Sequence, residues 1–217
     1  MIKAEKIQKV YDNSPVLEDL DLHVASGQFC IITGQSGTGK STLLNILSGL
    51  DKFQSGELFL MGKSVKDINS SEMALMRRKN IGFIFQSYNL ISSKNCLENV
   101  MLPLKYSKIR YFYRRNMAMS AIDKMGLTDK YYSYPHQLSG GQQQRIAVAR
   151  ALVTKPKILF CDEPTGNLDG ESANLVMDGI VSLRNSGSAV VMITHDKSLL
   201  SYADCAYVLK NGKLVQQ

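Results

Sequence analysis

The stretch Gly34-Gln35-Ser36-Gly37-Thr38-Gly39-Lys40-Ser41-Thr42 determines how the rest of this chain is interpreted. It matches G-x-x-x-x-G-K-[ST], the pattern of a phosphate-binding loop. The apolar run at residues 29–33 predicts a buried strand before the loop, and apolar residues at three- to four-residue spacing predict a helix after it. A glycine-rich turn that matches by chance would lack this context. We therefore predict a nucleotide site here.

The residue types of this loop suit a triphosphate. Glycines let the main chain pass close to the phosphates, so that successive N–H groups and the start of the next helix face anionic oxygens. Lys40 is expected to reach the β- and γ-phosphates, and the hydroxyl of Ser41 is expected to hold Mg²⁺.

Composition sets wide limits on the rest of the molecule. The chain has 217 residues, 44% of them hydrophobic, which suits one globular domain with a lobe. Its net charge of +7 suits nucleic acid, an anionic membrane surface or nucleotide phosphate, without choosing among them. No apolar run approaches the ~18 residues of a membrane span, and the start of the chain has no signal-peptide pattern. We expect a cytosolic protein that reaches a membrane only through a partner.

The four cysteines are scattered along the chain, at Cys30, Cys96, Cys161 and Cys205. None of them forms a C-x-x-C pair, so reduced thiols are expected rather than disulfides or a zinc site.

Both ends of the chain have β patterns. Residues 2–27 read as strands, and Leu20, Leu22 and Val24 alternate with polar residues, as in a half-buried antiparallel strand. Asn211-Gly212 between two apolar runs predicts a final hairpin. Tyr11 is expected between the first two strands, where it is either a purine-stacking ring or an ordinary strand-end tyrosine.

Polar side chains follow three predicted buried strands. Gln86 follows residues 81–85, His195 follows residues 188–194, and the pair Asp162 and Glu163 ends the strand at 157–163. Ligands of open α/β sheets gather at such strand ends. The prediction is that Asp162 positions Mg²⁺ and Glu163 activates water as a general base.

The other two strand-end residues have related predicted roles. Gln86 is expected to approach Mg²⁺ or the attacking water, although a lone glutamine here is more often a loop residue. His195 is expected to contact the γ-phosphate.

The middle of the chain changes character. Residues 87–137 are helical in pattern and rich in Tyr and Met, which indicates a helical lobe over about 87–155, inserted in a single domain of residues 1–217. One part of it is basic and carries Lys105, Lys108, Arg110, Arg114 and Arg115, with Tyr106, Tyr111 and Tyr113 among them. This stretch is either a nucleic-acid patch or a solvated helical face, and the interspersed Met and Ile favour the second.

A second anion-binding helix start is predicted at Leu138-Ser139-Gly140-Gly141-Gln142-Gln143-Gln144-Arg145. One phosphate loop with two phosphate-binding helix ends suggests that the second end serves a nucleotide held by another copy of the chain. A plain loop is the alternative for Ser-Gly-Gly taken alone. Downstream, Pro164-Thr165-Gly166-Asn167-Leu168-Asp169 is expected to form a turn that opens a helix.

The order of these motifs resembles that of the ATP-binding-cassette (ABC) ATPases over nearly the whole chain, and the L-S-G-G-Q match discriminates most. The resemblance implies an α/β fold, with a P-loop NTPase core of mostly parallel sheet, an N-terminal antiparallel β subdomain and an inserted α-helical lobe. It also implies an ATPase that forms a head-to-tail homodimer with two ATP and Mg²⁺ at its interface.

The resemblance further implies a role for each matched position. Ser139, Gly140, Gly141 and Gln142 would bind the nucleotide of the opposite subunit, and Asp169 would lie in the segment touching that subunit. Tyr11 would stack on adenine, Gln86 and Asp162 would serve the metal, Glu163 would be the catalytic base and His195 the γ-phosphate contact.

Within the family, segments such as Phe85-Gln86-Ser87-Tyr88-Asn89-Leu90-Ile91 resemble the branch of macrolide exporters and lipoprotein-releasing ATPases. That branch implies a location on the inner face of the cell membrane and an integral-membrane permease, contacted near residues 86–101 and worked as a lever on peptide, antibiotic or lipoprotein cargo. Two alternatives remain, a cell-division-type regulator of wall hydrolases and a soluble ATPase acting on nucleic acid or ribosomes. Direct nucleic-acid binding is not expected.

Overall fold

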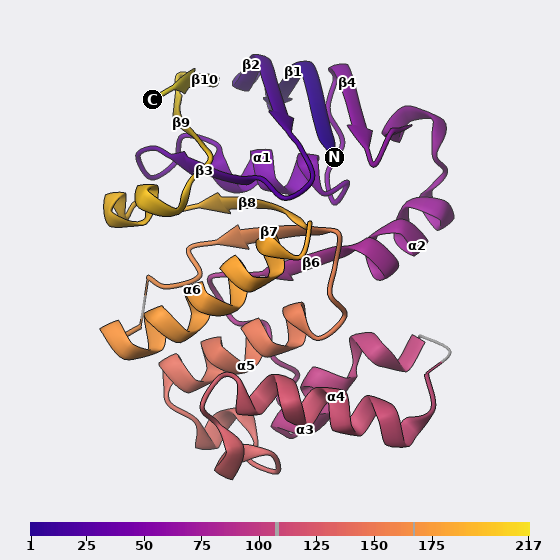
Figure 1. The fold of residues 1–217 in the computed structure, drawn as a ribbon. Helices are drawn as coiled ribbons and strands as arrows, with labels where there is room; N and C mark the ends of the chain where they lie inside the picture. The colour runs from indigo at the N-terminus through magenta and orange to yellow at the C-terminus, as the bar shows by residue number, and fades with distance from the viewer. Residues whose placement is uncertain (107–108, 167) are drawn as a thin grey trace.

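The larger of two sheets forms the centre of the molecule (Figure 1). The computed structural model describes residues 1–106, 109–166 and 168–217, so Lys108 of the basic stretch and Asn167 lie outside the described residues. Across the larger sheet the strand order is β10-β9-β3-β8-β7-β6, parallel except for the edge strand β10. The strands are β3 (Phe29–Thr33), β6 (Ile81–Ile84), β7 (Ile158–Asp162), β8 (Ala189–Ile193), β9 (Cys205–Lys210) and β10 (Lys213–Gln216).

The smaller sheet is antiparallel, in the order β2-β1-β4-β5. Its strands are β1 (Ile2–Tyr11), β2 (Ser14–Val24), β4 (Ser55–Leu60) and β5 (Lys63–Ser64). Leu20, Leu22 and Val24 are buried while the residues between them are exposed, which confirms the predicted alternation. Tyr11 corrects one expectation, because it is the last residue of β1 rather than part of the connection.

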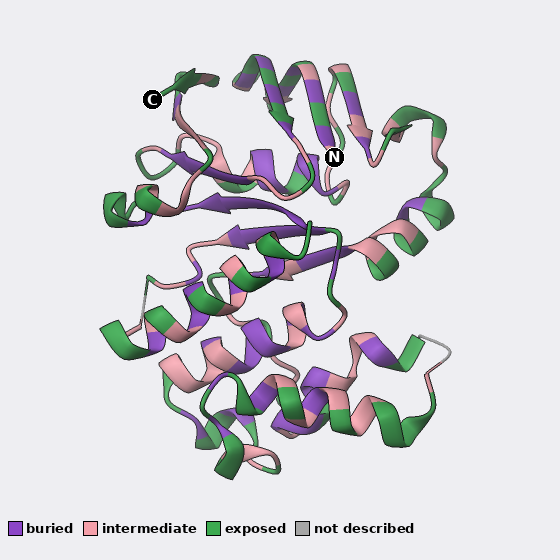
Figure 2. Ribbon diagram, in the orientation of Figure 1, coloured by how far each residue is buried: buried purple, intermediate pink, exposed green. Residues whose placement is uncertain are grey.

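Strand alternation divides the interior into two hydrophobic cores. On β7, Ile158 and Phe160 face the antiparallel sheet and helix α1 (Lys40–Leu47), whereas Leu159 and Cys161 face the helices on the other side. The central strands are therefore buried on both faces, as Figure 2 shows in purple. This double burial explains why their sequences are continuous apolar runs.

Most of the described α-helices begin at a residue whose side chain caps the first turn. The helices after α1 are α2 (Ser70–Asn80), α3 (Cys96–Met101), α4 (Tyr111–Asp123), α5 (Gly140–Leu152) and α6 (Gly170–Asn185), with short 3-10 turns at Val65–Asp67, Pro103–Tyr106, Thr128–Lys130, Pro135–Gln137 and Lys197–Tyr202. Asn69 and Glu72 form the predicted capping box of α2, and Asn95 with Glu98 forms another on α3. Each box satisfies two N–H groups that the first turn leaves without partners.

The helical lobe is inserted between two strands that are neighbours in the sheet. β6 and β7 pair in parallel, and α3, α4 and α5 lie between them in the chain. Figure 1 shows these helices on the opposite side of the parallel sheet from α1. No helix in the described part of the chain is long and apolar enough to cross a bilayer. The four cysteines are free thiols, as expected, and Cys30, Cys96 and Cys161 are buried.

Phe160 tests the packing between the sheets. It is fully buried on β7 and stacks against Phe83 of β6, with ring centroids 5.5 Å apart. Replacing Phe160 by Ala leaves a cavity there, so we expect Phe160→Ala to lower the free energy of unfolding by about 3–5 kcal/mol in urea titrations. Phe112→Ala is the matched control, because Phe112 is 64% exposed, and it should change stability by less than about 0.5 kcal/mol. Equal losses in both variants would contradict this packing.

Candidate functional site

A cleft of about 500 Å³ forms where the loop after β3 meets the carboxyl ends of the neighbouring strands. The strand-end residues Gln86, Asp162, Glu163 and His195 all line it, although they are far apart in the sequence. The other residues that line it are Val16, Gly34, Ser36, Gly37, Gly39, Lys40, Ser41 and Thr42. Of the predicted phosphate-binding loop, Gln35 and Thr38 are outside this lining, and Thr38 Oγ1 instead donates to the carbonyl of Gln35 at 2.9 Å.

Two glycines of the loop are required by its close contacts. Gly39 has φ +95°, and a Cβ there would lie 2.7 Å from Val16 Cγ1. Gly34 has φ +153°, and a Cβ there would lie 2.8 Å from the carbonyl oxygen of Leu209. A side chain at either position would force the backbone to move, so the loop shape depends on glycine.

Lys40 already lies over the loop. Its Nζ donates to the carbonyl oxygens of Gly34 at 2.8 Å and Gln35 at 2.7 Å. An ammonium group held at the mouth of the loop is positioned for an anion, and Gly39 at the start of α1 adds N–H groups with the positive end of the helix dipole. The site therefore favours a phosphate-bearing ligand.

Oxygen atoms suited to a magnesium ion lie beside the loop. The hydroxyl of Ser41 donates to Asp162 Oδ2 at 3.1 Å. Burial raises the pKa of Asp162, and the neighbouring carboxylate of Glu163 raises it further. A cation bound there would offset both effects, which fits a metal ligand.

A protein-only metal site is absent from the described residues, because no three Asp, Glu, His or Cys side chains gather to hold an ion. Mg²⁺ commonly binds through one or two protein oxygens together with phosphate oxygens. Ser41 and Asp162 fit that pattern, and Gln86 lines the same cleft.

Glu163 is fixed in an uncommon backbone conformation. Its φ is +49°, and its N–H donates to the carbonyl of Ile193 on β8 at 2.9 Å. Its carboxylate contacts His195 Nδ1 at 2.9 Å through Oε1 and accepts from Thr194 Oγ1 at 3.2 Å through Oε2. Non-glycine residues held at positive φ are often found at functional sites. The carboxylate is thus oriented from both oxygens at the edge of the cleft.

The residues predicted around the start of α5 are not in this cleft. Among the described residues that line it, none is Ser139, Gly140, Gly141 or Gln142. Ser139 instead caps α5, accepting from Gln142 N at 3.2 Å, while Gln142 Oε1 accepts from Ser139 N at 3.0 Å. Figure 1 shows α5 across the parallel sheet from α1. Within one copy of the chain, the two predicted anion-binding helix starts therefore lie at different surfaces.

Asp169 and Tyr11 also lie outside the cleft lining within the described residues. Asp169 caps α6, and its hydrogen bonds from the backbone and hydroxyl of Ser172 lower its pKa. Tyr11 is 45% exposed, and its hydroxyl donates to Asp51. Lys9 Nζ lies 4.4 Å from the centroid of the Tyr11 ring, so the ring is held in place from one side.

Two polar residues of α5 that the sequence did not single out by role connect the strand-end loops. The guanidinium of Arg150 donates to the carbonyls of Tyr88 at 2.8 Å and Asn89 at 2.6 Å, just after Gln86. The side chain of Gln144 donates to the carbonyl of Pro164 at 3.0 Å, just after Glu163. All three acceptors are backbone carbonyls, so no residue pattern at the accepting end could reveal these hydrogen bonds.

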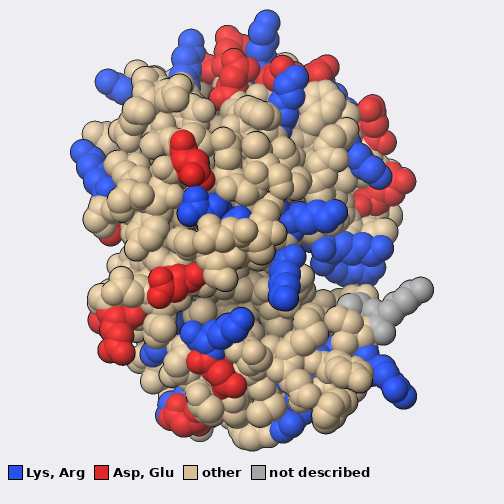
Figure 3. Space-filling model, in the orientation of Figure 1, with Lys and Arg blue, Asp and Glu red and all other residues tan. Residues whose placement is uncertain are grey.

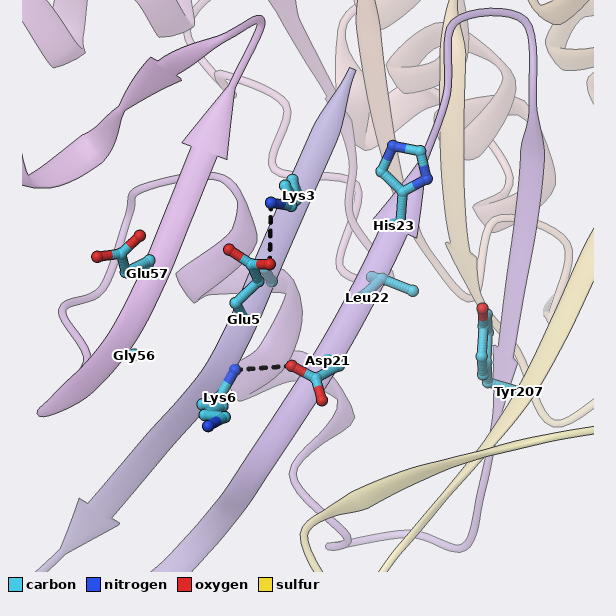
Figure 4. A pocket seen from close by; sticks show the side chains of 10 residues that line it. Lys3, Glu5, Lys6, Asp21, Leu22, His23, Gly56, Glu57 and Tyr207 are labelled. Carbon is cyan, nitrogen blue, oxygen red and sulfur yellow. Dashed lines mark hydrogen bonds and ion pairs between the residues drawn. The ribbon is translucent and has the colours of Figure 1, made fainter.

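A larger hollow, of about 840 Å³, lies on the antiparallel sheet, but its polar side chains do not point toward a common ligand position (Figure 4). Lys3 and Glu5 form an ion pair at 2.9 Å, and Asp21 accepts from the backbone of Lys6 at 2.8 Å. Figure 4 shows these side chains spread along neighbouring strands rather than aimed at one point. The cleft at the phosphate loop is therefore the better candidate site.

Comparisons with known proteins show the family of this chain. The family model described as "ABC transporter" matches residues 17–166. The lipoprotein-releasing system ATP-binding protein LolD of Psychrobacter arcticus is 41% identical, with 98% of this chain and 96% of LolD covered. The macrolide export ATP-binding/permease protein MacB of Campylobacter fetus is 42% identical over 99% of this chain, which spans only 34% of MacB.

Solved structures extend the similarity to the fold. The dimeric structure of MJ0796, a bacterial ABC transporter cassette, superposes with a TM-score of 0.94 at 36% identity, covering 100% of this chain and 98% of that one. The same cassette is also known as a dimer bound to ADP and Pi after hydrolysis. The expected α/β fold and the expected family are thereby confirmed, and the chain belongs to the ABC transporter family as one of its ATP-binding, ATP-hydrolysing subunits.

Proposed function

We propose that residues 1–217 act as one ATPase domain, that two copies close head to tail around two ATP, and that this closure works a membrane permease. One observation carries the proposal. The cleft gathers the phosphate loop and three strand ends, yet the second anion-binding helix start, at Ser139, lies outside it. A second copy supplying its own α5 would complete each site, as in a dimer whose interface holds the ligand.

In this proposal the phosphate loop binds the triphosphate. N–H groups of residues 34–42 and the ammonium of Lys40 hold the phosphates, and the carbonyls now bonded to Lys40 are released as the ligand arrives. Ser41, Asp162 and Gln86 are the residues that would hold Mg²⁺, which neutralises phosphate charge when bound.

Glu163 is proposed as the general base and His195 as a contact of the γ-phosphate. The 2.9 Å contact between them and the hydrogen bond from Thr194 orient the Glu163 carboxylate toward the cleft side where water would attack. Placing both residues after parallel strands keeps them fixed to the most deeply buried part of the protein.

The remaining predicted contacts are proposed to act across the dimer interface or on the adenine ring of ATP. Ser139, Gly140, Gly141 and Gln142 would face the γ-phosphate held by the other copy, and Asp169 would touch that copy. Tyr11 would stack on adenine with the ring face that Lys9 leaves free.

The coupling to a permease is proposed to pass through the lobe. Arg150 and Gln144 tie α5 to the loops after Gln86 and Glu163, so a movement of α5 toward a second copy also moves both loops. A permease contacting residues 86–101 would receive this movement. The names of the relatives LolD and MacB support lipoprotein release or macrolide export as the class of work. In this proposal the chain works at the inner face of the cell membrane, beside its permease.

Glu163→Gln tests the shared site. Without the base, hydrolysis should fall by at least about a hundredfold. ATP should still bind, so the variant is expected to accumulate as a dimer with Mg·ATP, measured by light scattering after size exclusion. Glu57→Gln is the control, because Glu57 is an exposed glutamate of β4, away from the proposed dimer contacts and outside the cleft lining. A Glu163→Gln variant that stays monomeric at millimolar Mg·ATP would show the shared-site model to be wrong.

Co-purification tests the permease. Tagged chain extracted from membranes should recover a protein with several membrane spans. Ser93→Arg, a bulky change at an exposed position within residues 86–101, should reduce that recovery severalfold while ATP hydrolysis continues. Ser71→Arg on α2 is the matched control and should recover the partner normally. Recovery of only nucleic acid or ribosomes would instead support the soluble ATPase alternative, and recovery of a wall-hydrolase regulator would support the cell-division alternative.

A further inference from the structure

The lobe carries a basic surface that lies outside both the nucleotide cleft and the proposed permease contact at residues 86–101. Residues 99–122 contain five lysines and arginines and no aspartate or glutamate. Four of these cations are described: Lys105 on the 3-10 turn Pro103–Tyr106, Arg110 just before α4, and Arg114 and Arg115 on α4. In Figure 3 further blue side chains gather where α2 lies in Figure 1, beside this lobe.

Large aromatic rings stand exposed on the same surface. Tyr106 is 61% exposed, Tyr111 and Phe112 are each 64% exposed, and Tyr113 is 58% exposed. We call the set Lys105, Tyr106, Arg110, Tyr111, Phe112 and Tyr113 the aromatic–basic tip. Single exposed apolar side chains are common on any protein surface, whereas a cluster of them marks a surface that binds a protein or a membrane.

The positive charge of this surface is not compensated within the described residues. None of the salt bridges there involves Lys105, Arg110, Arg114 or Arg115. Arg114 instead lies over the ring of Tyr111 at 5.9 Å, and Arg78 of α2 lies over Tyr106 at 5.5 Å. An anionic partner would be attracted to these cations, and no existing ion pair would have to break when it binds.

The geometry favours a fluid partner over a rigid groove. Tyr111, Phe112 and Tyr113 are consecutive, so on a helix with 3.6 residues per turn they point in three directions. A protein groove binds side chains at i, i+3 and i+4, which share one face. Further along α4, Ala118 and Ile122 are buried against the lobe, so the helix is anchored at that end and projects its first turn.

We propose that the aromatic–basic tip inserts into the headgroup region of a bilayer that contains anionic phospholipid. Tyrosine and phenylalanine rings settle at this depth, and arginine and lysine are attracted by the anionic headgroups. The tip follows α3 directly in the chain, and Arg114 Nη1 donates to the carbonyl of Lys105 at 3.2 Å, which holds its two parts together. Lipid contact would thus lie next to the proposed permease contact and would hold the lobe against the membrane; the location rests on the proposed function.

Vesicle flotation of the full chain tests this. It should float with vesicles of phosphatidylcholine and phosphatidylglycerol but not with phosphatidylcholine alone, and the binding should weaken as salt is raised. Arg110→Gln should weaken binding about fivefold, and Phe112→Ser by roughly tenfold. Lys210→Gln and Val215→Ser remove an exposed cation and an exposed apolar side chain on β9 and β10, and both controls should bind like the unaltered chain.

Opposite outcomes would overturn the proposal. Absence of flotation with anionic vesicles, or equal losses in the tip variants and the controls, would exclude a lipid-specific tip. Binding of the tip to a nucleic acid or an acidic peptide without lipid binding would assign it to another partner. Permease recovery in detergent is measured separately from vesicle binding. A chain that does not bind lipid therefore leaves the proposed function standing, and a chain that recovers no permease leaves the lipid test standing.

Discussion

The 3.1 Å contact between Ser41 and Asp162 joins the phosphate loop to the central strand β7, and the site depends on what makes it possible. β3 and β7 flank β8 in one parallel sheet, so the loop after β3 and the residues after β7 and β8 come out at the same edge. Burial on both faces keeps these strands in register. The same packing raises the pKa of Asp162, which leaves a carboxylate that gains from a bound cation. Fold stability and ligand chemistry therefore meet at one edge of the sheet.

A second constraint is that the start of α5 lies away from the phosphate-loop cleft of its own chain. It packs against the face of the parallel sheet opposite α1, where Ile146 belongs to the same core as Val176 of α6. Ser139 caps its first turn, and Ser139 and Gly140 are exposed. Hydrogen bonds from Arg150 and Gln144 nevertheless link this helix to the strand-end loops of the cleft. A partner that engages the start of α5 can thus alter the cleft without touching it, which is the property that a two-state motor requires.

Much of the fold could be predicted from the sequence, because its signals are local. The phosphate loop, the capping box at Asn69 and the final hairpin each depend on a few adjacent residues. The convergence of Gln86, Asp162 and His195 also followed from strand ends, since parallel strands share an edge. The links made by Arg150 could not be predicted, because they end on backbone carbonyls. The exposure of Tyr106, Tyr111 and Tyr113 fits both interpretations of the basic stretch, a nucleic-acid patch and a solvated helical face, so the residue pattern alone could not assign these rings a partner.

Mixing two inactive variants tests most directly whether the site is shared. Lys40→Ala removes a phosphate contact of the phosphate-loop surface, and Ser139→Arg blocks the surface at the start of α5. Each variant alone should therefore hydrolyse almost no ATP. Random mixing gives about half heterodimers, each with one intact site of two, so an equimolar mixture should regain up to about a quarter of the unaltered rate. If each chain completed its own site, Ser139→Arg alone would remain active and mixing would only dilute it. That result would contradict the account.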